Sequence, residues 1–134
     1  MANLKPIVVK TELMWDDREI INSQSKKYQI NLTHLSDDAV KKLTEIGVKV
    51  RNDKHDPEQG NYIVVKSANY PIKAELEDGT PIINAKIANN SKAVATVKPY
   101  TWTFSGDTGV GTGVGRIVVT EYAEYTGPSM DNPL

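Results

Sequence analysis

Hydrophobic and polar residues alternate along several short stretches of the chain, and this period of two is typical of a half-buried β-strand. In "KKYQINLT", residues 26–33, the apolar side chains of Tyr28, Ile30 and Leu32 are separated by polar ones. Similar patterns predict further extended segments at 48–51, 61–68, 69–77, 82–88, 93–104 and 116–125. The segment 69–77 precedes a turn at Asp78-Gly79, and 93–104 is the longest strand candidate.

One segment has helical periodicity instead. Apolar residues recur every three or four positions between Leu35 and Ile46. Ser36 suits the N-cap of a helix, two aspartates follow it in the first turn, and Gly47 suits a C-terminal stop. These signals predict one helix, over about 36–46.

Five or more short strands with one helix place the chain in the all-β class, as mainly β structure with one short helix. Small chains of this class form a barrel or a sandwich, and the strand count fits the OB-fold, a five-stranded partly open barrel, here with hairpin extensions. The sequence has no internal repeat and no linker-like segment. We therefore expect a single domain over 1–125 and a loose tail over 126–134.

The composition excludes several classes of protein. With 134 residues, 39% of them hydrophobic and 25% charged, the chain can bury a core and lacks the composition of a disordered protein. It has no cysteine, which excludes disulfide scaffolds and thiolate metal sites. No apolar run approaches the roughly 20 residues of a membrane span, and we expect no secretory signal and no membrane partner. Because the net charge is −1, any site for a polyanion must come from local clustering of the sixteen Lys and Arg residues.

No arrangement of residues typical of catalysis or of a bound cofactor is recognisable. His34 and His55 stand apart, and no second His or Cys completes a metal site near the acidic loop 52–60. The run "GDTGVGTGVGR" at 106–116 resembles a phosphate loop only superficially, since a strand rather than a helix follows it. We therefore expect no metal, no cofactor and no enzymatic activity, and we interpret the glycine run as a flexible hairpin loop.

Aromatic and basic residues are interleaved on the predicted strands. If 93–104 is regular, Lys98, Tyr100 and Trp102 share one face, while Pro99 indicates a sheet edge or a bulge. The same mixture recurs in two neighbouring segments, at Tyr62, Lys66, Tyr70 and Lys73. Large aromatic side chains usually fill a core, but lysine resists burial. Rings and cations on exposed strands are what a groove for single-stranded nucleic acid requires, because bases stack on rings and cations contact phosphates. Both interpretations stay open for each ring, since some aromatics must fill the barrel.

From about residue 27 to residue 125 the chain resembles a known family, the OB-fold single-stranded DNA-binding proteins of tailed bacteriophages. The family's strand of type Y-x-v-x-l is present as "YQINL", and "VVKSANYPIK" and "DGTPI" match two further segments. The most specific match is "NNSKAVATVKPYTWTFSGDTGVGTGVGRIVVTEYAEY", in the spacing of Asn90-Ser91, Tyr100, Trp102, Gly106 and Gly109.

The resemblance implies sequence-tolerant, non-catalytic binding of single-stranded DNA during phage replication, recombination or repair, in the cytoplasm of the infected bacterial host. It is compatible with self-association along the strand and with contacts to phage replication proteins. Such proteins often end in a strongly acidic tail with a terminal aromatic residue that recruits partners. This chain ends "SMDNPL", with Asp131 as the one acid of that segment, so recruitment through the tail is not implied.

The predicted interface combines stacking rings with cations. The candidate rings are Tyr62, Tyr70, Tyr100 and Trp102, and the candidate phosphate contacts are Lys66, Lys73, Lys92, Lys98, Arg116 and Arg51. Trp15 fits either the edge of the groove or the core. Two alternatives remain: a phage structural or protein-interaction β-domain whose aromatics are core or interface, and an OB-fold nuclease.

Overall fold

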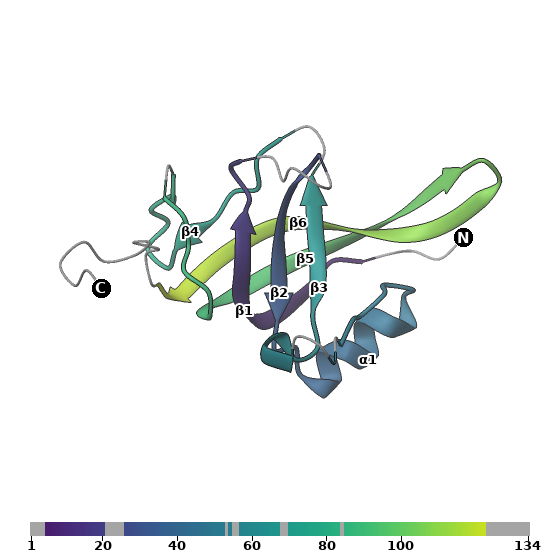
Figure 1. The fold of residues 1–134 in the computed structure, drawn as a ribbon, viewed down its shortest axis with the longest axis horizontal. Helices are drawn as coiled ribbons and strands as arrows, with labels where there is room; N and C mark the ends of the chain where they lie inside the picture. The colour runs from purple at the N-terminus through teal and green to yellow at the C-terminus, as the bar shows by residue number, and fades with distance from the viewer. Residues whose placement is uncertain are drawn as a thin grey trace, which may run out of the picture.

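The structure is a computed structural model of the chain, and it describes residues 5–20, 26–52, 54, 57–67, 70–83 and 85–122. Its elements within these ranges are β1 (Ile7–Asp17), β2 (Tyr28–Thr33), α1 (Asp37–Glu45), a 3-10 helix (Pro57–Gln59), β3 (Ile63–Ser67), β4 (Glu75–Leu76), β5 (Ser91–Phe104) and β6 (Asp107–Glu121). The strands form one sheet in the order β3-β2-β1-β5-β6-β4 (Figure 1).

Strand β1 lies in the middle of this sheet and changes partners along its length. From Ile7 to Leu13 it pairs antiparallel with β5, and from Glu12 to Asp17 it pairs antiparallel with β2. A bulge interrupts the β2 ladder between Met14 and Asp17, and bulges bend a strand and increase its twist. The sheet therefore curls around β1 instead of remaining flat.

The curl brings β3 against β6, although the two strands form no ladder. Thr112 Oγ1 of β6 donates a 2.8 Å hydrogen bond to the carbonyl of Val64 in β3. Five strands, β1, β2, β3, β5 and β6, thus make a partly open barrel, and the two-residue β4 adds to β6 in parallel. This is the arrangement of the OB-fold, which confirms the predicted fold class.

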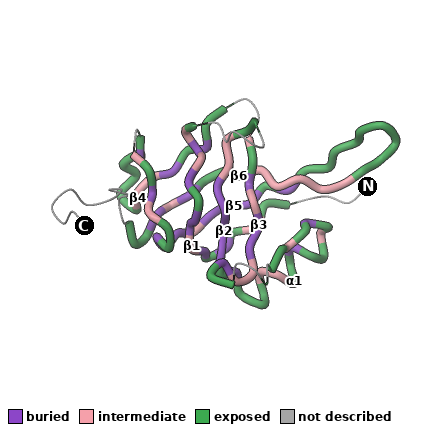
Figure 2. The backbone as a smooth tube through the Cα atoms, viewed as in Figure 1, coloured by how far each residue is buried: buried purple, intermediate pink, exposed green. Residues whose placement is uncertain are grey.

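Alternate residues of the barrel strands fill its interior, as expected from the pleat of a strand. Val9 and Leu13 of β1 are buried, and so are Ile30 and Leu32 of β2. A single cluster joins them to apolar residues of every other strand except β4, whose Leu76 packs against the cluster half-buried. In Figure 2 the buried residues, in purple, lie along these strands where the strands cross in the middle of the view.

The predicted helix is confirmed as α1, and both of its ends follow the sequence signals. The hydroxyl of Ser36 accepts a backbone N–H of the first turn. At the other end Gly47 has φ +92°, and the N–H of Val48 donates to the carbonyl of Leu43 at 3.0 Å. This is the Schellman motif, which satisfies carbonyls that the helix leaves free. Across the described part of the chain, no helix has the length and apolar character needed to cross a membrane.

Strands β5 and β6 continue beyond the barrel as a two-stranded arm, drawn on the right of Figure 1. The arm ends in a two-residue turn at Ser105 and Gly106, whose φ angles are +51° and +85°. Turns with two positive φ angles match the twist of a hairpin. The glycine run at 106–115 thus forms this turn and an ordered strand, so its interpretation as a flexible loop is wrong. Pairing with β5 removes the freedom that glycine has in isolation.

Other expectations differ from the structure in extent. β1 was not among the predicted strands, although Val9, Thr11 and Leu13 alternate with more exposed residues. Among the described residues of 69–77 only Glu75 and Leu76 form a strand, and those of 82–88 form none, although Ile82 and Ile87 are buried in the core. The extended segment 48–51 makes a single bridge, between residues 51 and 62. The predicted tail, 126–134, lies outside the described residues.

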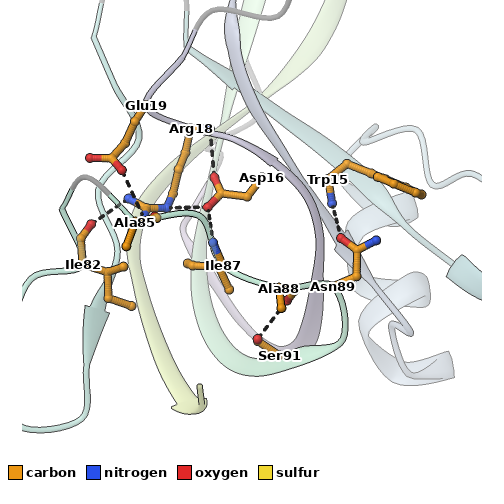
Figure 3. Close-up of polar contacts among 10 residues, drawn as sticks. All are labelled: Trp15, Asp16, Arg18, Glu19, Ile82, Ala85, Ile87, Ala88, Asn89 and Ser91. Atoms are coloured by element: carbon orange, nitrogen blue, oxygen red, sulfur yellow. Dashed lines mark hydrogen bonds and ion pairs between the residues drawn. The ribbon is translucent and has the colours of Figure 1, made fainter. Parts of the chain in front are cut away.

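A buried arginine joins the end of β1 to the segment that precedes β5 (Figure 3). Arg18 is 1% exposed and donates to the carbonyls of Ile82, at 2.9 Å, and Ala85, at 2.8 Å. Its Nε lies 3.2 Å from Asp16 Oδ2, and that oxygen also accepts the N–H of Ile87 at 2.8 Å. Because a buried charge requires partners, this network holds Ile82, Ala85 and Ile87, which belong to none of the strands.

Replacing Arg18 with methionine should lower the free energy of unfolding by about 3–5 kcal/mol, because Asp16 would remain buried without its cation. Urea denaturation followed by circular dichroism measures the loss. Lys10→Met, which removes an exposed cation from β1, the strand that Arg18 follows, is the control and should change little. Equal denaturation midpoints for Arg18→Met and the unmodified protein would show that the network does not hold this segment.

Candidate nucleic-acid interface

The arm carries large side chains of β5 across glycines of β6. Gly109, Gly111, Gly113 and Gly115 alternate along β6, so they share one face of the strand. Trp102 pairs with Gly109 and Tyr100 pairs with Gly111. A Cβ atom on either glycine would overlap the ring opposite it. The absence of a side chain at Gly109 and Gly111 therefore lets both rings lie directly on the backbone of the neighbouring strand.

These two rings line a groove between the arm and the barrel. Its volume is about 380 Å³, and its walls also include Val64, Val110 and Thr112. The hydrogen bond from Thr112 to Val64 holds the two walls together at the bottom of the arm. Tyr100 and Trp102 are 49% and 43% exposed, so each ring rests on one surface and presents another to solvent.

The charges around the groove are all positive among its described lining residues. Lys27, Lys49, Arg51 and Lys66 reach it from four separate places: the residue before β2, two positions of the segment after α1, and β3. A separate hollow of about 470 Å³ is lined by three acids, Asp16, Asp17 and Glu19, beside Lys86. A molecule with a net charge of −1 thus presents a local cationic surface.

Two smaller hollows continue from the groove along β6. The first, of about 290 Å³, shares Lys66 with the groove and is also lined by Tyr70, Lys73 and Gly115. The second, of about 210 Å³, shares Lys73 and Gly115 with the first and includes Arg116. The three hollows form one path, which we call the basic path.

The structure brings most of the predicted site residues to this path. Seven of the ten line it, namely Arg51, Lys66, Tyr70, Lys73, Tyr100, Trp102 and Arg116. Lys98 lies beside it, with its stem across Gly115. The bulge that Pro99 suggested lies instead between Ala95 and Val97, so the faces beyond it remain as predicted. Pro99 itself falls beyond the last β1 partner of β5, where the strand is an edge.

Three other residues lie away from the path. Tyr62 is 8% exposed and belongs to the buried residues, so its ring offers no free face for stacking and we remove it from the interface. Lys92 lies at the start of β5, where its ammonium is 3.6 Å from Glu121 Oε2. Trp15 is exposed, lines none of the three hollows, and points away from the Arg18 network (Figure 3).

Sequence reasoning did not select Lys27 and Lys49, which line the groove. Both are single lysines at the ends of predicted elements, and no local pattern distinguishes them from other surface lysines. Phe104 was also left out of the predicted site, although it shares a face of β5 with Tyr100 and Trp102 and is 76% exposed at the tip of the arm. Its period-two spacing from Trp102 was a usable signal.

The described residues offer no site for a metal, since no group of three or more His, Asp or Glu residues is close enough to hold an ion. The path instead offers flat rings, backbone surfaces and positive charges. These are the groups that bind bases and phosphates without regard to sequence.

The solved structures that resemble this one include single-stranded DNA-binding proteins of two bacteriophages. The protein of bacteriophage Enc34 gives a TM-score of 0.67 at 12% identity, over 93% of this chain and 86% of that chain. The same protein in complex with ssDNA gives 0.66 at 11% identity, over 91% and 89%. The T7-encoded protein gp2.5 gives 0.55 at 13% identity, over 96% and 92%. The chain has the fold of these phage proteins.

No protein-family model matches the chain, and no curated protein matches it in sequence. At identities of 11–13% the likeness establishes the fold of this chain and nothing about its individual side chains. The assignment of residues to the basic path therefore depends on the geometry of this structure alone.

Placing a valine at position 109 should lift Trp102 from the backbone of β6, because the new side chain occupies the space of the ring. In a Trp15→Phe background, Trp102 is the one remaining tryptophan. We expect Gly109→Val to shift its emission to longer wavelength and to increase quenching by acrylamide. Thr108→Val, on the opposite face of the same strand, is the control. Identical spectra for the two variants would contradict the contact between ring and glycine.

Proposed function

We propose that the protein binds single-stranded DNA without sequence preference and without catalysis, along the basic path. The observation that carries the proposal is the groove itself, where the rings of Tyr100 and Trp102 lie among four cations and no described acid. Bases stack on such rings, and the cations neutralise the phosphates that connect them. The fold shared with phage proteins that bind single-stranded DNA, one of them solved in complex with ssDNA, supports the same function.

The arrangement favours single strands over duplex. A ring can stack only on a base whose face is free, and the faces are covered by neighbouring pairs in a double helix. In this proposal the groove between arm and barrel receives bases, while Lys27, Lys49, Arg51 and Lys66 contact the phosphates. Tyr70 and Lys73 extend the contact surface along β6.

In the biological setting that we propose, the protein covers single strands exposed during phage DNA replication, recombination and repair inside the infected bacterial cell. Self-association along the strand and contacts with phage replication proteins remain part of the hypothesis. A protein-interaction domain of the same fold would lack affinity for oligonucleotides, and a nuclease would cut them when Mg²⁺ is added. Titration of a fluorescent oligo-dT with and without Mg²⁺ therefore separates the three functions.

Replacing Trp102 with alanine should weaken binding of oligo-dT by about 5- to 150-fold, the equivalent of about 1–3 kcal/mol of base stacking. Fluorescence anisotropy of a labelled oligonucleotide at low salt measures the change. Trp15→Ala is the matched control, because Trp15 is similarly exposed but lines no part of the path. If both variants bind as the unmodified protein does, stacking on Trp102 is not part of the interface.

Replacing Lys49 with glutamine should reduce the salt dependence of binding. Each phosphate neutralised on a single strand contributes a slope of about −0.7 to a plot of log K against log salt. The slope of Lys49→Gln should therefore be shallower by about 0.7. Lys92→Gln removes a lysine that pairs with Glu121 outside the path, and it should leave the slope unchanged. An unchanged slope for Lys49→Gln together with a shallower slope for Lys92→Gln would place the phosphates elsewhere on the molecule.

A further inference from the structure

The basic path contains one acidic residue among its described lining residues, and it lies at the end farthest from the groove. The groove and the middle hollow are lined by lysines and an arginine with no carboxylate. The last hollow includes Glu75 together with Lys73 and Arg116. The Nε of Arg116 donates a hydrogen bond to Glu75 Oε1. The predicted phosphate contact at Arg116 is therefore already bound to an anion of the protein.

The backbone holds Glu75 in this position from both sides. As the first residue of β4 it pairs with Val118 of β6, and a bridge on its other side joins it to Pro81. Its side chain is 25% exposed, against 64% for Arg116. The hydrogen bond and the charge of Glu75 also raise the pKa of Arg116 above its ordinary value. The carboxylate thus reaches Arg116 from a fixed strand. A phosphate that arrives from solvent would have to displace this carboxylate to bind Arg116.

We propose that Glu75 masks Arg116 and so ends the basic path, leaving Lys73 as the last cation that contacts the phosphates of a bound single strand. The inference rests on the proposed function and adds to it a residue that limits the length of the site. The physical reason is competition between two anions for one guanidinium. The carboxylate is covalently attached nearby and needs no ordering of a nucleotide, so it holds Arg116 unless the gain from one more phosphate exceeds the loss of the pair.

The test compares Glu75→Gln with Glu77→Gln, since both remove one negative charge from neighbouring positions. Glu77 is exposed and lines none of the three hollows. Binding of a fluorescent oligo-dT, long enough to exceed the path, is measured across a range of salt concentrations. We expect Glu75→Gln to bind about two- to fivefold more tightly than Glu77→Gln at low salt. Its salt slope should be steeper by about 0.7, because one additional phosphate is neutralised.

A second pair of variants assigns the gain to Arg116. Arg116→Gln alone should leave affinity and slope nearly unchanged, whereas Lys66→Gln should make the slope shallower by about 0.7. Combined with Glu75→Gln, Arg116→Gln should remove the gain of the single variant. Thermal unfolding of each variant checks that the fold is retained.

Three outcomes would overturn the inference. The first is an equal effect of Glu75→Gln and Glu77→Gln on binding. The second is weaker binding by Glu75→Gln. The third is a loss of binding in Arg116→Gln alone that is as large as the loss in Lys66→Gln. The last two would mean that Glu75 orients Arg116 toward the DNA. If the unmodified protein binds no oligo-dT, the proposed function and this inference fail together. If it binds and the glutamate variants match, only the inference fails.

Discussion

The contact between aromatic rings of β5 and glycines of β6 is the constraint on which the candidate interface depends. A glycine within a strand costs roughly 0.5–1 kcal/mol relative to alanine. A ring that covers the glycine from the neighbouring strand can offset this cost, as in designed sheets. Gly109 and Gly111 each accept one ring in this way. Tyr100 and Trp102 are thereby supported from below while they remain open to solvent above.

The barrel gives these rings their cationic surroundings. Its closure, with Thr112 of β6 bonded to Val64 of β3, places the arm opposite the segment that carries Lys49 and Arg51. The buried Arg18 network holds Ile82, Ala85 and Ile87, which precede β5 and belong to none of the strands. The polar groups of the Arg18 network are thus not among the residues that line the groove.

Local signals in the sequence were sufficient for some elements and misleading for others. The ends of α1 were predicted because Ser36 and Gly47 act within one turn of the helix. The glycine run was interpreted as a flexible loop because glycine favours turns, and its ladder with β5 is a long-range property. Tyr62 lies one residue before β3 and is buried, whereas the alternation of its segment left both a core role and a stacking role open. The ion pair between Arg116 and Glu75 could not be predicted, because the two residues lie forty-one positions apart.

The sequence by itself determined the alternation of most strands, the single helix, and the face of β5 that carries Lys98, Tyr100 and Trp102. These features depend on residues within a few positions of one another, so periodicity reveals them. Only the tertiary structure decided which faces meet: that glycines lie under the rings, that Lys27, Lys49, Arg51 and Lys66 converge, and that Arg116 is already paired. Strand pairing and barrel closure set these contacts over long separations, and no local pattern of polar and apolar residues encodes them.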